Sequence, residues 1–276
     1  MSVRGRSDPH DETPRLGDLY LYPVKGARGA RVERLELDDF GARGDRRWMM
    51  VGPDGVFVSQ RELPALARIR AAYDDDVLVL SGAAHPTVSV RTPADDAARV
   101  SVRIWHDTTE AVDAGDEAAG WLASVLGRAL RLVYMPDDVV RPVHPGFARP
   151  GDRVSFADGF PFLLISQAAL DGLNERLATP LPMNRFRPNL VVDGVAAHAE
   201  DGWKRIAIGD VEVDIVKPCA RCVVTTVNQD TGERGTEPLR TLAEYRRLGS
   251  NVMFGQNGIH RGRGMLRVGD PVRVLA

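Results

Sequence analysis

Short segments in which apolar and polar residues alternate dominate the first half of the chain. A period of two is typical of strands that bury one face, and Gly, Pro and Asp separate these segments as turn residues. A helix is predicted at 116–127, where apolar residues recur at helical spacing and Gly127 ends the pattern. The alternation predicts strands at 19–25, 31–37, 46–52, 56–60, 77–82, 87–92 and 99–105.

The second half of the chain repeats this style. Helices are predicted at 167–178, with Ser166 as the capping residue, and at 241–248. Many short strands with few helices predict a mixed α+β fold that is mainly β, with antiparallel, barrel-like sheets. The predicted strands are 161–166, 189–194, 204–210, 211–216, 223–227 and a closing pair within 265–275.

A Pro- and Asp-rich stretch follows the first predicted helix and separates the two halves. We place a domain boundary near residue 136, so that one domain covers residues 16–135 and a second covers 136–276. Residues 1–15 are polar and mixed in charge, and we expect them to form a disordered tail. This start also has no apolar core of a signal peptide.

Composition and charge narrow the class of protein. The 276 residues provide ample core for one large or two medium domains. The net charge of −2 gives no global attraction to nucleic acid or to anionic membranes. No stretch approaches the roughly 20 apolar residues that span a bilayer. We therefore expect a cytoplasmic protein without nucleic-acid or membrane partners.

The only two cysteines of the chain, Cys219 and Cys222, lie three residues apart. In a thioredoxin-like motif the first cysteine opens a helix, whereas this pair lies between the β-branched segments 211–216 and 223–227. We therefore predict a strand, a tight turn and a strand, with no helix near the thiols. A zinc site would need further ligands that no second C-x-x-C or H-x-x-x-H pattern supplies. A lone thiolate that ligates a soft metal, attacks an electrophile or carries sulfur remains open, as do two inert buried thiols.

Cationic side chains gather in four short motifs. Lys217 and Arg221 flank the cysteine pair, where their charge favours the thiolate. Arginine forks match phosphate bidentately, so the motifs would form an anion site if the fold brought them together. Taken singly, each motif is an ordinary group of surface charges. The other three motifs contribute Lys25 with Gly26, then Arg43, Arg46 and Arg47, and then Arg185, Arg187 and Asn189.

Several longer segments, in this order, carry a family resemblance. They include YPVKG, GDRRWMMV, ADGFPFLLISQAALDGLN, NRFRPNLVVDG, PCARCVVTTVNQDTG and LRVGDPVRVL. The chain closely resembles MOSC-domain proteins with an N-terminal MOSC β-barrel domain, a family that includes mitochondrial amidoxime-reducing components and bacterial N-hydroxylate reductases. The resemblance covers about residues 16–276, and it implies an N-terminal MOSC β-barrel-like domain followed by a MOSC β-barrel domain with a few helices.

The resemblance implies a molybdenum cofactor, in which molybdopterin and one protein cysteine hold the metal. By position in the motif, Cys222 would be the metal ligand and the catalytic residue. The resemblance also implies a set of cofactor-binding residues, with cations on the phosphate and polar groups on the pterin or its tail. That set is Lys25, Arg46, Asp158, Arg187, Asn189 and Arg221.

The implied activity is a molybdenum-dependent oxidoreductase that reduces small N-hydroxylated substrates. Some relatives end in a ferredoxin-like domain that needs four cysteines, which this chain does not contain. We therefore expect electrons from a separate ferredoxin- or cytochrome-like donor protein. The alternative is a sulfur carrier, or a protein that sulfurates or delivers the molybdenum cofactor, with a persulfide on Cys222. A non-catalytic binding module would require that the cysteine and arginine motifs do not converge.

Overall fold

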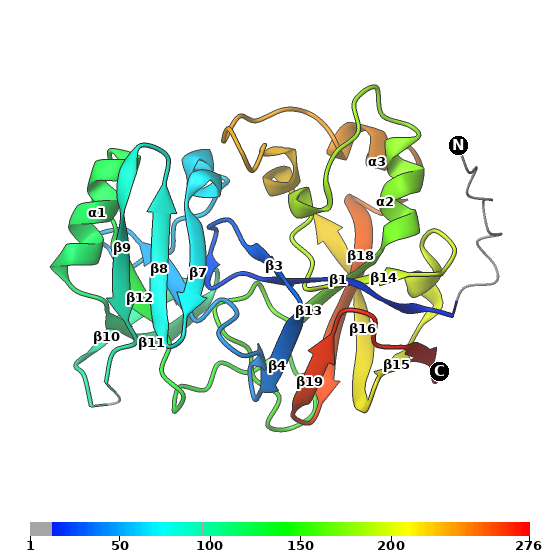
Figure 1. The fold of residues 1–276 in the computed structure, drawn as a ribbon, viewed down its shortest axis with the longest axis horizontal. Coiled ribbons are helices and arrows are strands. Elements are labelled where there is room, and N and C mark those ends of the chain that lie inside the picture. The colour runs from blue at the N-terminus through cyan, green and yellow to red at the C-terminus, as the bar shows by residue number, and fades with distance from the viewer. Residues whose placement is uncertain (1–12, 95) are drawn as a thin grey trace, which may run out of the picture.

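The computed structural model describes residues 13–94 and 96–276. Most of the predicted tail 1–15 therefore lies outside the described residues, and Arg15 already belongs to the first strand. Figure 1 shows two β-rich halves side by side, with helix α1 (Asp116–Leu126) at one end of the molecule and the C-terminus at the other.

The largest sheet has nine strands and contains residues from both ends of the chain (Figure 1). Its neighbouring strands run antiparallel except β13 and β14, which are parallel. A short strand, β17 (Arg247–Leu248), pairs with β18 beside the main path. The order of that path is β20 (Val272–Val274), β15 (Arg205–Ile208), β16 (Val211–Arg221), β18 (Asn251–Arg261), β13 (Phe162–Ser166), β14 (Leu190–Asp193), β1 (Arg15–Leu21) and β3 (Ala30–Val32).

The first strands of the chain complete the sheets of its second half. β1 pairs with β14, and β4 (Arg34–Asp38) pairs with β19 (Gly264–Arg267) and with β5 (Gly41–Ala42). Alternating leucines of β1 and β4 explain this strand pairing, because their side chains are buried in one core with those of strands β13 to β16. The division near residue 136 stays a prediction, and β1 and β4 pack with the half that follows it, whereas β2 pairs with β6 in the other half. The leucines are Leu16, Leu19, Leu35 and Leu37.

Two smaller sheets build the other half. The mixed, mainly β class is confirmed, and none of the four sheets that the described residues form closes on itself. One sheet is ordered β10 (Arg99–Ile104), β11 (Asp107–Asp113), β12 (Arg131–Tyr134), β6 (Trp48–Val51) and β2 (Val24–Lys25). The other is ordered β7 (Arg70–Asp74), β8 (Val77–Gly82) and β9 (His85–Arg91).

All three predicted α-helices are confirmed, each ending a little earlier than predicted. They are α1, α2 (Gln167–Asn174) and α3 (Leu239–Tyr245). Ser166 caps α2, since its hydroxyl accepts a hydrogen bond from the Ala169 amide at 3.3 Å. Within residues 13–94 and 96–276, no helix combines the length and the apolar character that a membrane crossing needs. Short 3₁₀ helices are η1 (Pro64–Arg68), η2 (Met183–Arg185), η3 (Ala199–Gly202) and η4 (Val223–Thr226).

The predicted strand at 56–60 is wrong. Val56 and Phe57 form only isolated bridges, and the Ser59 carbonyl accepts the amides of Glu62 and Leu63, which turns the chain. Conversely, the pattern did not reveal β7 or β11, because both strands carry charged or small residues at positions that face solvent.

The strand predicted at 223–227 is also wrong, and this changes the environment of the cysteines. β16 continues through Cys219 to Arg221, and helix η4 follows with Cys222 as its capping residue. The hydroxyls of Thr225 and Thr226 donate to carbonyls three residues earlier, at 2.9 and 2.8 Å. These local bonds offer the backbone an alternative to strand pairing, so β-branched residues here form a helical turn beside the thiol.

Candidate functional site

One pocket between the two halves collects every predicted site residue. Its walls come from β2, from the turn before β6, from the segments 157–163 and 186–189, and from the end of β16. Both cysteines lie in it. The predicted residues that line it are Lys25, Arg46, Asp158, Arg187, Asn189, Arg221 and Cys222. The convergence that the anion-site hypothesis needed is therefore a property of the fold, whereas the individual roles stay predictions.

The two cysteines of the pocket are separate free thiols, and both are half-buried. Because a strand advances about 3.3 Å per residue, the extended segment from Cys219 to Cys222 separates their Cα atoms by about 10 Å. A disulfide needs Cα atoms less than about 7 Å apart, so the fold does not present a dithiol. The Cys222 carbonyl accepts both the amide and the hydroxyl of Thr225, which anchors this residue at the start of η4.

Lys25 of β2 also lines the pocket, and only 10% of its side chain is exposed. Its ammonium donates to Asp158 Oδ1 at 2.5 Å and lies 5.3 Å from the centre of the Phe57 ring. Burial lowers the pKa of Lys25, and the Asp158 carboxylate opposes this shift. Asp158 also accepts from the Trp105 indole at 3.1 Å, so its carboxylate is held between two donors.

Arg46 and Arg187 have the same unusual backbone conformation and contact the same aromatic ring. Each has a left-handed backbone, with φ of 49° and 58°, which is uncommon for residues other than glycine. Their guanidinium carbons lie 4.5 and 4.4 Å from the centre of the Tyr22 ring. Non-glycine residues in this region cost about 1–3 kcal/mol and persist where the surroundings over-determine them. Contact with the Tyr22 ring is part of what holds both arginines in this conformation.

The positive charge of the pocket exceeds its negative charge. Among the described residues, no carboxylate forms an ion pair with Arg187 or Arg221, although Arg46 pairs with Asp45. Burial lowers the pKa of Arg187 to about 10. The buried Nε of Arg221 has no hydrogen-bond partner among the described residues. Guanidinium groups without carboxylate partners give the pocket the chemistry that binds an anion, and the anion site stays a prediction.

Asn189 is buried, and both its side-chain oxygen and its side-chain nitrogen form two hydrogen bonds within the protein. Its oxygen accepts from Arg46 at 2.8 Å and from the Leu163 amide at 3.4 Å. Its nitrogen donates to Asp45 at 3.1 Å and to the Tyr20 carbonyl at 3.2 Å. This arrangement positions Arg46, and the cofactor contact that the resemblance implies for Asn189 stays a prediction.

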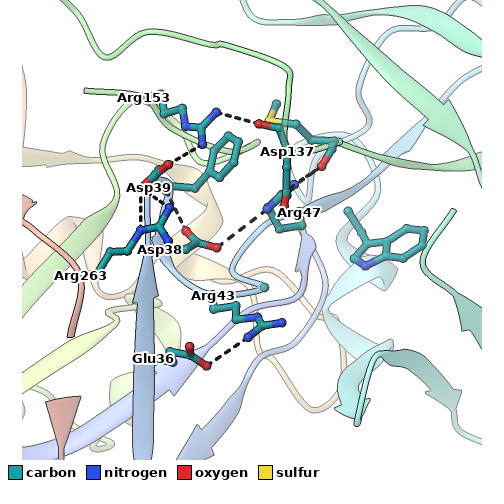
Figure 2. Close-up of polar contacts among 12 residues, drawn as sticks. Glu36, Asp38, Asp39, Arg43, Arg47, Asp137, Arg153 and Arg263 are labelled. Carbon is teal, nitrogen blue, oxygen red and sulfur yellow. Dashed lines mark hydrogen bonds and ion pairs between the residues drawn. The ribbon is translucent and has the colours of Figure 1, made fainter. Parts of the chain in front are cut away.

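Not every cation of the predicted anion motifs reaches the pocket. Figure 2 shows Arg43 paired with Glu36, and Arg47 directed toward Asp38 and Asp137. Arg47 is buried and its guanidinium lies 4.2 Å from the centre of the Phe40 ring, so it joins the halves structurally. In the same network Asp39 binds Arg153 at 2.8 Å and Arg263 at 3.0 Å. Of the three arginines in GARGDRRW, only Arg46 lines the pocket.

Two further residues of the pocket, Gln60 and Trp105, lie outside the motifs of the sequence. Gln60 is buried, donates to the Gly26 carbonyl at 2.7 Å and exchanges amide hydrogen bonds with Gln229. Trp105 has a left-handed φ of 55° and carries the Arg61 guanidinium at 4.5 Å from its ring. Only tertiary contacts distinguish these residues, since neither belongs to a recognisable motif. Across the described ranges, no three His, Cys, Asp or Glu side chains gather closely enough to hold a metal ion.

Comparisons with known proteins agree with this layout. Residues 13–129 match the family described as the MOSC N-terminal beta barrel domain, and residues 151–273 match the MOSC domain. The chain is 35% identical over 280 residues to mitochondrial amidoxime-reducing component 1 of Homo sapiens, covering 94% of this chain and 82% of that protein. It is 32% identical over 287 residues to mitochondrial amidoxime reducing component 2 of Bos taurus, covering 97% and 85%. The chain therefore belongs to the family of MOSC-domain proteins that carry an N-terminal MOSC β-barrel domain.

Proposed function

We propose that this protein is an oxidoreductase that binds the molybdenum cofactor in the pocket and reduces small N-hydroxylated substrates. In the reaction the substrate gains two electrons and two protons, its N–O bond breaks and water leaves. A separate donor protein supplies the electrons. The observation that carries the proposal is the shared pocket of Cys222 and five cations, which come from segments far apart in the chain. The names of the relatives support the type of reaction.

The residues present fit this cofactor. A phosphate group would find the guanidinium of Arg187, which forms no ion pair with a described carboxylate, and Arg46 beside it. A soft metal would find a cysteine thiol in the same pocket. Arg221 donates to Cys219 Sγ at 3.0 Å and to the Phe186 carbonyl at 2.6 Å, and its Nε has no partner among the described residues. The phosphate and the metal of the cofactor would thus each meet side chains of matching chemistry in one pocket.

The bound cofactor would supply the two-electron redox chemistry, and the chain's own residues would hold and orient the reactants. Cys222 would hold the metal, and the hydrogen bonds from Thr225 would fix its backbone. Asp158 would hold the Lys25 ammonium in place by accepting its hydrogen bond, and Trp105 would keep that carboxylate in place. Phe57, Trp105 and Phe160 line the pocket and would exclude water from a bound planar substrate.

The test uses protein produced in a host that makes molybdopterin, with benzamidoxime as substrate and reduced methyl viologen as electron donor. We expect Cys222→Ala to abolish reduction, because the metal would lose its protein ligand. Cys219→Ala is the matched control, since it removes a thiol from the same wall, and we expect it to retain most activity. Unchanged activity in Cys222→Ala would overturn the proposed ligand.

Metal and sulfur analysis separates this proposal from the sulfur-carrier alternative. We expect about one molybdenum and one pterin per chain in the purified protein. Metal-free protein that carries cyanolysable sulfur on Cys222 would instead support sulfur transfer or cofactor delivery. The cytoplasmic location stays a prediction.

A further inference from the structure

Six arginines gather beside the pocket, and we call them the arginine rim. They come from the start of the chain, from the segment around η1 and β7, from η2 and from the loop after η4. Four of them, at positions 61, 68, 70 and 234, are exposed. The members of the rim are Arg28, Arg61, Arg68, Arg70, Arg185 and Arg234.

Hydrogen bonds join the segments that form the rim, so the rim is one continuous surface. Arg234 donates to the Arg61 carbonyl at 2.6 Å and to the Gln60 carbonyl at 3.3 Å. Beneath them, the buried amides of Gln60 and Gln229 bind each other at 3.0 and 3.2 Å. A Cβ on Gly232 would lie 3.5 Å from Cδ of Arg68, so the loop after η4 passes directly over η1.

The rim carries excess positive charge although the whole chain is slightly acidic. The stretches 61–70 and 228–234, which contain four of the six arginines, also contain the carboxylates Glu62, Asp230 and Glu233, so the six arginines exceed these carboxylates by three charges. Asp230 pairs with Arg28. Among the described residues, no ion pair joins a carboxylate to any of the other five arginines.

Part of the rim is concave. Arg28, Arg68 and Arg70 line a small hollow together with Ser81 and Asp230. Arg28 and Arg70 meet there through a backbone bridge, and Arg70 lies opposite Ser81 in the pairing of β7 and β8. Guanidinium groups at such a hollow match the protruding carboxylates of an acidic protein surface.

The rim begins at the proposed redox site. Arg61 lines the pocket, and its guanidinium lies against Trp105, which is bonded to Asp158. Arg185 donates to the carbonyl of Thr225, another pocket residue, at 3.4 Å. A protein seated on the rim would therefore place its own redox centre beside this pocket.

We propose that the arginine rim docks a small acidic protein that delivers one electron at a time. This inference rests on the proposed function, which needs an external reductant. Two successive carriers would each be oxidised by one electron, and two protons from water would complete the cleavage of the N–O bond and the release of water. Charge complementarity steers such encounters and makes their rates sensitive to salt.

The test compares two donors on the same cofactor-loaded protein. The protein donor is an acidic plant-type [2Fe–2S] ferredoxin, and the small donor is reduced methyl viologen. The variant is Arg68→Glu with Arg70→Glu, because both side chains are exposed and neither lines the catalytic pocket. The matched control is Arg267→Glu with Arg273→Glu, which makes the same charge change on β19 and β20. In Figure 1 β19 lies at the bottom, whereas the orange loop over η1 lies at the top.

We expect the rim variant to lose about tenfold or more of the ferredoxin-driven rate at low salt, a typical size for electrostatic steering. Its viologen-driven rate should stay within twofold of wild type, and the control pair should match wild type with both donors. Added salt should lower the wild-type ferredoxin rate and leave the variant nearly unaffected. A calorimetric titration of ferredoxin into cofactor-free protein should show the same loss of affinity without turnover.

A rim variant that equals wild type in both the ferredoxin rate and the titration would overturn the docking surface. An equal loss in the distant control pair would also overturn it, because net charge alone would then explain the effect. Failure of the proposed function gives a different result, since wild-type protein would then show no viologen-driven reduction.

Discussion

At the scale of single residues, Tyr22 holds two charged neighbours at the pocket. Its ring lies under the guanidinium groups of both Arg46 and Arg187. The ring packs against Gly29, where a Cβ would lie 2.2 Å from a ring carbon. Burial raises the pKa of Tyr22 well above its usual range, and its hydroxyl has no partner among the described residues. The ring, and not the hydroxyl, is therefore the part of Tyr22 that positions the arginines.

We expect Tyr22→Leu to weaken anion binding by about tenfold, because each cation–π contact contributes roughly 0.5–2 kcal/mol. Tyr22→Phe keeps the ring and should bind nearly as wild type. Titration calorimetry of cofactor-free protein with pyrophosphate measures this directly. Equal affinities for Tyr22→Leu and wild type would show that the backbone alone sets the two arginines.

At the scale of elements, β18 is the strand on which the large sheet depends. It pairs with β16, β13 and β17, and it contains Gly255 at a φ of 79°. A Cβ at this position would lie 2.6 Å from Cγ1 of Ile165 and 2.7 Å from the Leu164 carbonyl oxygen. The glycine therefore permits both the left-handed backbone and the close approach of β13.

We expect Gly255→Ala to lower the free energy of unfolding by about 2–4 kcal/mol, from backbone strain and overpacking together. Gly120→Ala in α1 is the control, since a Cβ there meets nothing within 4 Å. That change should raise stability by about 0.5–1 kcal/mol through helix propensity. Urea unfolding of both variants gives the comparison, and a Gly255→Ala variant as stable as wild type would contradict the packing argument.

At the scale of the whole molecule, the two halves are not independent. Four leucines of β1 and β4 are buried in the core of the second half. Burial of each leucine contributes about 1.5–3 kcal/mol, so together they match the entire stability of a typical domain. The pocket also takes Lys25 from the same N-terminal region and Cys222 from the second half.

We expect a fragment of residues 43–276 to lack a native fold, which near-ultraviolet circular dichroism would detect. Residues 13–42, supplied as a separate chain, should restore the signal because they bring the missing strands. A native spectrum from 43–276 alone would show that the rest of the molecule folds without β1 to β5.

Acid should also destabilise the molecule through two histidines. Burial lowers the pKa of His198 and of His260, whose Nε2 lies 2.7 Å from the Asp38 carbonyl oxygen. Below pH 6.5 the unfolded chain then binds more protons than the folded protein, so the free energy of unfolding falls as the pH falls. For His260, the charges of Asp38 and Asp152 moderate the shift and that of Arg261 adds to it.

We expect urea midpoints to decrease between pH 7 and pH 5, and we expect His260→Gln to flatten this dependence. His85→Gln is the control, because His85 is only loosely packed at a turn of the β8–β9 hairpin. An unchanged slope in His260→Gln would exclude this histidine as a source of the acid sensitivity.

The sequence by itself determined the kind of most elements and the motifs whose side chains line the pocket. Alternation predicted most strands, helical spacing predicted three helices, and the motifs provided Lys25, Arg46, Arg187 and Cys222. These features are local, since a period, a cap or a motif depends only on neighbours along the chain.

Tertiary structure alone decided which of these residues meet. Arg46 turns into the pocket while Arg47 turns away, because one stacks on Tyr22 and the other on Phe40. The β-branched run after Cys222 became a helical turn because its threonine hydroxyls found local carbonyl acceptors. The sheets stayed open, and β1 joined the far half, because strand pairing depends on which buried faces meet across the fold. A sequence pattern specifies the face of each strand, but its partner is chosen by packing in three dimensions.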